Sequence, residues 1–341
     1  MSEVSPSDRS AASAPLDIGV VGVGSLGFHH ARLLRAMPDT RLVGVYDIDD
    51  ERRARVADEL GTRAYPNLQT LLSDSRAVTI AVPTRQHLEV GREALERDLD
   101  IFIEKPIASS LAEADALIRL ARTRGRSIQV GHVERFNGAV RACEPYLSAP
   151  LFIESHRLAP FVSRGTDVTV VLDLMIHDID LILSLVARPV VDLRAVGVSV
   201  LSPSVDIANA RLEFAGGAVA NITASRVSVE RQRKIRFFQP TGYISLDLGR
   251  GTGEFYRRKT GRADGPAPTA LTDIVERVSL RGDDREPLAL ELESFVDAVR
   301  GGRAVAVTAE EGRQALAVAL DIVDHIERHR RHVLDSTTTG T

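Results

Sequence analysis

The sequence has a single cysteine, Cys143, so no disulfide can form within the chain. A lone thiol is typical of a protein in a reducing compartment, and we therefore expect a cytoplasmic location. Cys143 lies in "VRACEPYL", at helical spacing from apolar neighbours. This position predicts core packing rather than reactivity.

Long hydrophobic runs are also missing. The N-terminal "MSEVSPSDRSAASAPLD" has no apolar segment of the kind found in secretory signals. No other run approaches the roughly 20 apolar residues that span a bilayer. We therefore expect no signal peptide and no membrane partner, and residues 1–15, which are small and polar, are predicted to be a disordered tail.

An excess of positive charge is missing as well, because 43 Lys and Arg residues are outnumbered by 47 Asp and Glu, for a formal net charge of −4. A nucleic-acid partner is not expected, since no basic stripe dominates. Only Lys105, Lys234 and Lys259 are lysines. Lysine can release a proton where arginine cannot, so Lys105, in the abrupt strand ending "DIFIEKPIAS", is a candidate for chemistry.

The first half of the chain alternates apolar strands with amphipathic helices. The expected strands are 18–23, 41–49, 77–84, 100–106 and 127–132. Strands that are apolar throughout and separated by helices favour parallel pairing with both faces of the sheet covered. The 341 residues suffice for two domains. We therefore expect an α/β protein whose first domain, residues 16–140, is a doubly wound parallel sheet.

A glycine motif, Gly22-Val23-Gly24-Ser25-Leu26-Gly27, follows the first strand and opens the first helix. Turn glycines alone would account for it, but an acidic residue, Asp47, ends the second strand 20 residues after Gly27. Gly22 permits a tight turn, Gly24 lets a pyrophosphate approach the backbone, and Gly27 brings helix and strand together. The pattern predicts a Rossmann domain that binds a dinucleotide through residues 22, 24–27 and 47.

The cofactor is expected to be NAD, because Asp47 can accept hydrogen bonds from a ribose diol and would repel a 2′-phosphate. Arg52 and Arg53 lie a few residues further on and leave NADP open as the less favoured alternative.

The second half changes period. Six strands are expected at 151–158, 193–201, 207–215, 218–228, 233–240 and 243–249. Their short connections indicate an open, mostly antiparallel sheet in a second α/β domain, residues 141–335, whose last helices return near the first domain. Ala220, Ile222 and Ala224 alternate with Asn221, Thr223 and Ser225, which predicts one packed face and one wetter face. The wetter face suits subunit contacts, and the Gly- and Pro-rich segment 249–270 is expected to be a mobile loop.

The segment "DLMIHDID", residues 173–180, places Asp173 and His177 four residues apart, on one face of a helix, with Asp178 and Asp180 pointing elsewhere. A histidine oriented by a carboxylate is a common proton acceptor. The alternative is a structural histidine beside a carboxylate at a helix N-terminus. A metal site from Asp173, His177 and His156 is the other alternative, but no paired ligand spacing supports it, and no metal is expected.

Taken together, "GVGSLG", "VPTRQH", "EKP" and "DLMIHDID" resemble, in order and spacing, the Gfo/Idh/MocA family of NAD(P)-dependent oxidoreductases over about residues 16–335. The resemblance implies a homodimer or homotetramer formed through the C-terminal sheet. It also implies that Lys105, Asp173 and His177 are catalytic, with a cis bond before Pro106 common in the family. Residues that would line the cofactor are Pro83, Thr84, His87, Glu104 and Lys105.

The expected reaction is oxidation of an alcohol. His177 would take the hydroxyl proton and Lys105 would stabilise the oxygen, although the sequence leaves open the reverse assignment, with Lys105 as the base.

A finer resemblance, in "VGHVERFNGAV", "FIESHRLAPF" and "RGTDVTVVLDLMIHDID", is to members of the family that oxidise C3 of UDP-N-acetylglucosamine on the way to the 3-amino sugars of lipid A. It implies a small nucleotide-sugar substrate. The alternatives are another sugar or polyol, such as an inositol or a free hexose, and a non-catalytic NAD-binding sensor. Candidate substrate-binding residues are Arg135, Asn137, Arg157, Arg164, His177 and Arg226.

Overall fold

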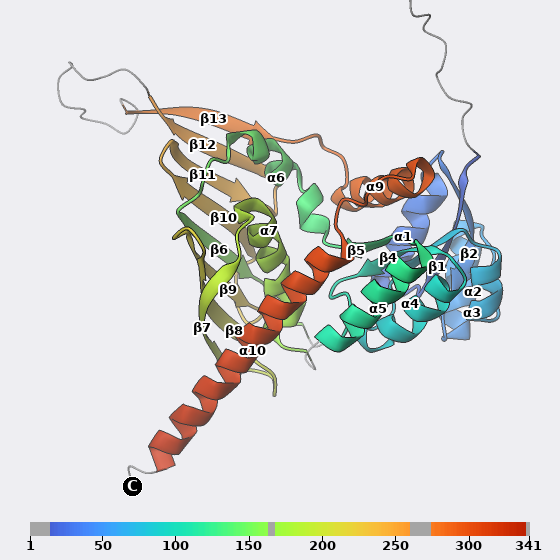
Figure 1. Cartoon of the computed structure of the whole chain (residues 1–341), viewed down its shortest axis with the longest axis horizontal. Coiled ribbons are helices and arrows are strands. Elements are labelled where there is room, and N and C mark those ends of the chain that lie inside the picture. Colours follow the sequence, from blue (N-terminus) through green and yellow to red (C-terminus); the bar gives the residue numbers. More distant parts are fainter. Residues whose placement is uncertain (1–13, 163–167, 260–273, 339–341) are drawn as a thin grey trace, which may run out of the picture. The chain divides into compact units, whose positions relative to one another are not determined.

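The computed structural model (Figure 1) describes residues 14–162, 168–259 and 274–338. All but the last two residues of the predicted tail, Arg164 and half of the predicted 249–270 loop therefore lie outside the described residues. The chain divides into two compact units. The first unit runs to Gly131 and includes 289–309, and the second runs from His132 to Leu288 and continues from Glu310. The structure thus places the division between the units after Gly131, whereas the sequence predicts it near residue 140.

The first unit contains a five-stranded parallel sheet in the order β2-β1-β3-β4-β5, which confirms the predicted Rossmann topology. Its strands are β1 (Leu16–Val21), β2 (Thr40–Tyr46), β3 (Ala77–Ile80), β4 (Asp100–Glu104) and β5 (Ile128–Gly131). Its helices are α1 (Ser25–Ala36), α2 (Asp50–Leu60), α3 (Leu68–Ser73), η1 (Thr84–Gln86), α4 (His87–Glu96), α5 (Leu111–Arg124) and α9 (Pro287–Gly301).

The helices of this unit begin and end where the side chains specify. The Asp49 and Ser110 side chains accept hydrogen bonds from backbone N–H groups in the first turns of α2 and α5. Gly61 and Gly125, in the left-handed conformation, end the same two helices. The sequence contained these signals, so the strand-helix alternation was predictable.

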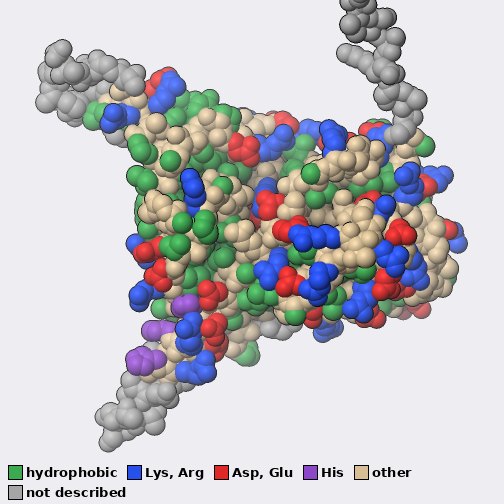
Figure 2. All heavy atoms as spheres, viewed as in Figure 1, with side chains coloured by type: hydrophobic (Ala, Val, Ile, Leu, Met, Phe, Trp, Pro, Cys, Tyr) green, Lys and Arg blue, Asp and Glu red, His purple; other side chains and the backbone are tan. Residues whose placement is uncertain are grey.

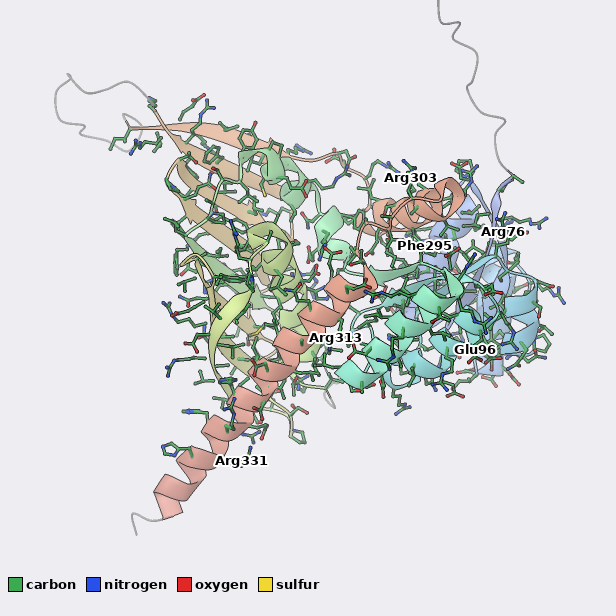
Figure 3. The ribbon with its side chains drawn as sticks, in the orientation of Figure 1. Arg76, Glu96, Phe295, Arg303, Arg313 and Arg331 are labelled. Carbon is green, nitrogen blue, oxygen red and sulfur yellow. The ribbon has the colours of Figure 1, made fainter. Side chains whose placement is uncertain are left out.

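Helix α9 packs on the first unit although it comes late in the chain. Phe295, labelled in Figure 3, meets Phe102 of β4 edge to face, with ring centroids 5.9 Å apart. The buried Gln129 side chain of β5 donates to the carbonyl of Glu291, at 3.1 Å. These contacts explain why 289–309 belongs with the first unit.

The second unit contains an eight-stranded sheet in the order β13-β12-β11-β10-β6-β9-β8-β7. Only the β6–β9 pair is parallel, so the prediction of a mostly antiparallel sheet is confirmed. Its strands are β6 (Phe152–Leu158), β7 (Val190–Val198), β8 (Ile207–Phe214), β9 (Val219–Ser225), β10 (Gln232–Gln239), β11 (Gly242–Asp247), β12 (Thr252–Arg258) and β13 (Val275–Arg281). Its helices are η2 (Val133–Phe136), α6 (Gly138–Cys143), η3 (Glu144–Tyr146), η4 (Val171–Met175), α7 (Ile176–Val186) and α10 (Ala309–Thr338).

Two features of this sheet differ from the sequence prediction. Residues 252–258, expected in a mobile loop, form β12 and pair with β11 and β13, because Phe255 is buried against the core. Ser225, expected on the wetter face, is buried, and its hydroxyl bonds to the backbone N–H of Val227 and the hydroxyl of Ser228. Strand periodicity predicts the face of the sheet on which a side chain lies. It does not reveal that a hydroxyl can be buried because it has hydrogen-bond partners nearby in the chain.

The packed face of the sheet forms one buried cluster with α7 and α10, to which Ile222, Phe237, Ile179 and Ile322 belong. Cys143 lies in this cluster, and burial with the nearby Glu144 charge raises the pKa of its thiol to about 12. The predicted core role of Cys143 is therefore confirmed.

The segment before α7 is not the α-helix that the sequence predicts. Val171–Met175 forms a π-helix that leads directly into α7. π-helical turns are rare and frequently occur at functional sites, and Asp173 lies in this one.

On the face that Figure 2 shows, Lys and Arg side chains are interspersed with Asp and Glu over the described residues. No helix of the described ranges is long and apolar enough to cross a bilayer.

Candidate active site

The glycine motif forms a sharp turn between β1 and α1. Gly22 has φ +82°, which favours glycine. A Cβ on Gly27 would lie 1.8 Å from the Gly22 carbonyl oxygen, so only glycine permits this approach of helix and strand. A Cβ on Gly24 would meet nothing within 4 Å, and no side chain caps the N-terminus of α1. The turn therefore leaves open backbone at the helix N-terminus, which fits the pyrophosphate of a dinucleotide.

The predicted neighbours of this turn are accessible. Ser25 and Leu26 are exposed on the first turn of α1. At the start of η1, Pro83 is exposed and Thr84 is half-buried. Contact of these four residues with a cofactor stays a prediction.

The carboxylate of Asp47, at the end of β2, is joined to the glycine turn. Its Oδ2 accepts from the Val23 N–H at 2.8 Å, and its Oδ1 accepts from the Asp49 N–H at 2.9 Å. The residue is 5% exposed. The structure thus brings together the two parts of the motif, and the remaining lone pairs of the carboxylate can accept from a ribose diol.

Two arginines surround this carboxylate. Arg52 donates to Asp47 at 3.2 Å and pairs with Asp49 at 2.8 Å. Arg53 donates to the Asp47 carbonyl and pairs with Asp50. Three carboxylates therefore face two guanidinium groups, and both arginines are held by this local network.

Glu104, which ends β4, is held inside the unit. Its carboxylate lies 3.0 Å from Nε2 of the fully buried His30, and its other oxygen accepts from the Lys105 N–H at 3.3 Å. Burial opposes its charge, but His30 and Lys105 outweigh burial and lower the pKa of Glu104. Gly131 makes room, since a Cβ there would lie 3.0 Å from Glu104 Oε2. Glu104 thus fixes the backbone that carries the half-buried Lys105.

His87 performs a similar holding role. Its Nδ1 lies 3.0 Å from the Pro106 carbonyl and its Nε2 3.0 Å from the Val82 carbonyl. The ring is buried, and burial lowers its pKa, so at neutral pH it carries one proton and donates to one of the two carbonyls. His87 links the segment after β3 to the Lys105–Pro106 bond, which is cis as the resemblance implied. This geometry supports positioning, while direct contact with a cofactor stays a prediction.

In the second unit, Asp173 and His177 lie on consecutive turns of η4 and α7, and both are half-buried. The next two carboxylates of α7, Asp178 and Asp180, which the sequence predicts to point elsewhere, are both buried. Asp178 accepts two hydrogen bonds from Arg157, at 2.8 and 2.9 Å, and Asp180 accepts two from Arg135. These bidentate pairs fix the rotation of α7 about its axis, and so the direction of His177.

The arginines proposed from the sequence as substrate ligands are engaged inside the unit. Arg157 is 4% exposed and also donates to Glu134, while Arg135 also pairs with Glu311 of α10. Arg226 pairs with Asp206, whose pKa is lowered by hydrogen bonds from Ser202 and Arg226 that outweigh its burial. These contacts account for all three positions, and a substrate role for any of them stays a prediction.

Asn137 is buried and has a structural place as well. Its side-chain oxygen accepts from the Ala139 N–H, and its amide donates to Glu134 and to the Leu248 carbonyl. Arg164 lies outside the described residues.

Two residues of the site, His30 and Glu134, could not be recognised from the sequence. His30 lies inside an amphipathic helical pattern, and Glu134 lies within "VGHVERFNGAV", so neither has a local signal of its own. Their roles depend on Glu104 and Arg157, which are distant in sequence. Within the described ranges, no group of three or more His, Cys, Asp or Glu side chains could hold a metal ion.

The geometry of the first unit is that of a dinucleotide-binding domain, and comparison with known proteins gives the class of protein, an oxidoreductase. Residues 16–132 match the model of an oxidoreductase family with an NAD-binding Rossmann fold, and residues 118–245 match the GFO/IDH/MocA C-terminal domain. The chain belongs to the Gfo/Idh/MocA oxidoreductase family.

Several relatives are similar over most of the chain. The UDP-N-acetylglucosamine 3-dehydrogenase of Acidithiobacillus ferrooxidans is 39% identical over 305 residues, covering 89% of this chain and 95% of that protein. A solved structure of that enzyme has a TM-score of 0.84 at 36% identity, covering 92% of this chain and 98% of the other. The myo-inositol 2-dehydrogenase of Thermotoga maritima is 27% identical over 337 residues, covering 92% and 97%.

Proposed function

We propose that this protein is an NAD-dependent dehydrogenase that oxidises C3 of UDP-N-acetylglucosamine to the 3-keto nucleotide sugar. The observation that carries this proposal is the 39% identity, over 95% of its length, to a relative that bears that activity in its name. The myo-inositol dehydrogenase, at 27%, is a more distant relative. Retention of Lys105, Asp173 and His177 favours an active enzyme over a sensor.

The proposed chemistry assigns a role to each of these side chains. Bound NAD supplies the hydride acceptor for the hydrogen on C3. His177 takes the proton of the C3 hydroxyl, and Asp173 stabilises the resulting imidazolium. Lys105 donates a hydrogen bond to the same oxygen as its negative charge develops. The reverse assignment, with Lys105 as the base and His177 as the donor, balances the same atoms.

The preference for NAD over NADP rests on the network around Asp47. A free arginine at this place would suit a 2′-phosphate, but Arg52 and Arg53 are already paired with Asp49 and Asp50. A phosphate here would meet three carboxylates and would have to break ion pairs.

The product has a carbonyl group at C3, which suits transamination by a second enzyme. We propose that the reaction takes place in the cytoplasm and leads to the 3-amino sugars of lipid A or of a surface polysaccharide. The single thiol is consistent with a reducing compartment.

The test is the absorbance of NADH when purified protein and NAD are mixed with UDP-N-acetylglucosamine, myo-inositol or glucose. Turnover with the nucleotide sugar alone supports the proposal. Turnover only with myo-inositol or glucose contradicts the substrate, and NAD binding without turnover of any of the three identifies a sensor.

A further inference from the structure

A hollow of about 440 Å³ opens at one end of the sheet in the second unit. It lies between the start of β10 with the turn before it and the end of β11 with the turn after it. Four cationic side chains and two carboxylates line it: Arg231, Arg233, Lys234, Arg250, Glu230 and Asp247. The surplus of positive charge indicates a site for an anion.

The cations of this hollow are weakly compensated. Arg231 and Lys234 form no ion pair with any residue that the structure describes. Arg233 reaches Glu134 only at 3.9 Å, and Arg250 reaches Asp247 only at 3.8 Å. Asp247 itself accepts from the backbone N–H groups of residues 249 and 250, so it is engaged in the turn. By comparison, the Arg157 side chain in the same unit donates two hydrogen bonds to the Asp178 carboxylate, at 2.8 and 2.9 Å.

The hollow is connected to the helix that carries His177. Arg233 faces Glu134, Glu134 accepts from Arg157 at 2.9 Å, and Arg157 is paired with Asp178, the residue after His177. The backbone beside the hollow is fixed from the same side, because Asn137 donates to the Leu248 carbonyl at 2.8 Å. A ligand bound here would therefore lie against the framework that orients α7.

We propose that this hollow binds the diphosphate of the nucleotide-sugar substrate, an inference that rests on the function proposed above. A diphosphate carries two negative charges, and guanidinium and ammonium groups hold phosphates by charge-assisted hydrogen bonds. This assigns phosphate binding to residues 231, 233, 234 and 250, in place of arginines that the fold already uses.

The test measures binding of UDP, and separately of inorganic pyrophosphate, to the full-length protein by calorimetry in the presence of NAD. The test variant combines Arg231→Gln with Lys234→Met, the two cations without an ion pair. The matched control is Arg194→Gln on β7, whose side chain is 84% exposed and pairs at 3.8 Å with Asp192. Loss of charge-assisted contacts is expected to weaken UDP binding by about tenfold or more in the double variant and to leave the control unchanged.

The outcomes separate this inference from the proposed function. A lower UDP affinity in the double variant supports diphosphate binding in the hollow. Lack of turnover of any nucleotide sugar by the wild-type protein would contradict only the proposed function. Equal UDP affinity in the wild type and the double variant contradicts diphosphate binding in the hollow, whether or not the protein oxidises a nucleotide sugar. The same conclusion follows if the wild type binds neither UDP nor pyrophosphate at millimolar concentration. A KM for the nucleotide sugar that rises in parallel with the UDP dissociation constant would connect the hollow to catalysis.

Discussion

At the scale of single residues, hydrogen bonds of neighbouring side chains fix the backbone that carries Lys105. The carboxylate of Glu104 accepts its backbone N–H, and His87 lies within hydrogen-bond distance of the Pro106 carbonyl. His30, buried on α1, faces that same carboxylate from the other side. The backbone that carries the amine is therefore fixed on both sides of the peptide bond between 105 and 106.

Replacing the amine tests its role. Lys105→Met keeps a similar side-chain length but removes the charge and the donated hydrogen bonds. We expect turnover to fall by roughly a hundredfold or more, the scale of general acid–base and electrostatic groups. Affinity for NAD, measured by fluorescence titration, is expected to stay within severalfold. A near-normal rate would remove Lys105 from the mechanism.

The pKa of Glu104 gives a prediction about pH. Because it lies below the ordinary value of 4.5, the ionised carboxylate stabilises the fold. This stabilisation is complete above pH 4.5 and is lost as the pH falls through the lower, folded-state pKa. Glu104→Gln is therefore expected to lower stability by about 1–3 kcal/mol at pH 7, the cost of weakening a buried charged hydrogen bond.

The measurement is the unfolding temperature of the wild type and the variant from pH 7 to pH 3. The difference between them should narrow below pH 4.5. The control is Glu96→Gln on the surface of α4 (Figure 3), which should show no such narrowing. A constant difference for Glu104→Gln across this range would mean that folding does not lower the pKa of this carboxyl group.

At the scale of elements, the turn between β1 and α1 separates two uses of glycine. An alanine at position 27 would collide with backbone, so Gly27→Ala is expected to cost about 1–3 kcal/mol of stability and to weaken NAD binding. An alanine at position 24 meets no atom and has an allowed φ of −65°. Gly24→Ala should thus keep the unfolding temperature while NAD affinity falls by about tenfold, because the pyrophosphate approaches this backbone. Equal NAD affinity in Gly24→Ala and the wild type would argue against that binding mode.

The elements also show what a sequence can and cannot predict. The strands of the first unit were predictable because apolar runs, caps and glycines act locally. The π-helix at Val171–Met175 was not, because it differs from an α-helix by one residue per hydrogen-bonded turn and side-chain spacing does not reveal it. Arg157 is a candidate substrate ligand on the sequence because a UDP-sugar carries two phosphate charges that need arginines, but its ion pairs could not be predicted. Its partners, Glu134 and Asp178, are brought to it only by the fold.

At the scale of the whole molecule, the wetter face of the second unit's sheet suggests self-association. A row of four aromatic rings crosses it from Phe152 through Phe238 and Tyr243 to Tyr256, with the two tyrosines stacked at 4.6 Å. Their neighbours Ile153, Phe237, Ile244 and Phe255 are buried in the core, so the row faces the opposite side. We propose that this row lies in a homodimer or homotetramer contact.

Mass measurement in solution checks the proposed contact. The wild type is expected to be a dimer or tetramer, and Tyr243→Glu should shift it toward monomer by placing a charge among the stacked rings. Arg194→Gln, a change to a different part of the sheet, should leave the mass unchanged. A wild type that is monomeric at micromolar concentration would contradict the proposal.

The central claim is that a hydride leaves C3 of a nucleotide sugar for NAD. The most direct measurement uses UDP-N-acetylglucosamine carrying deuterium at C3, with mass spectrometry of the reduced cofactor. We predict that the reduced cofactor gains one deuterium and that the sugar becomes a 3-ketone. Reduced cofactor without deuterium would place the oxidation at another carbon, and no reduction at all would contradict the proposed activity.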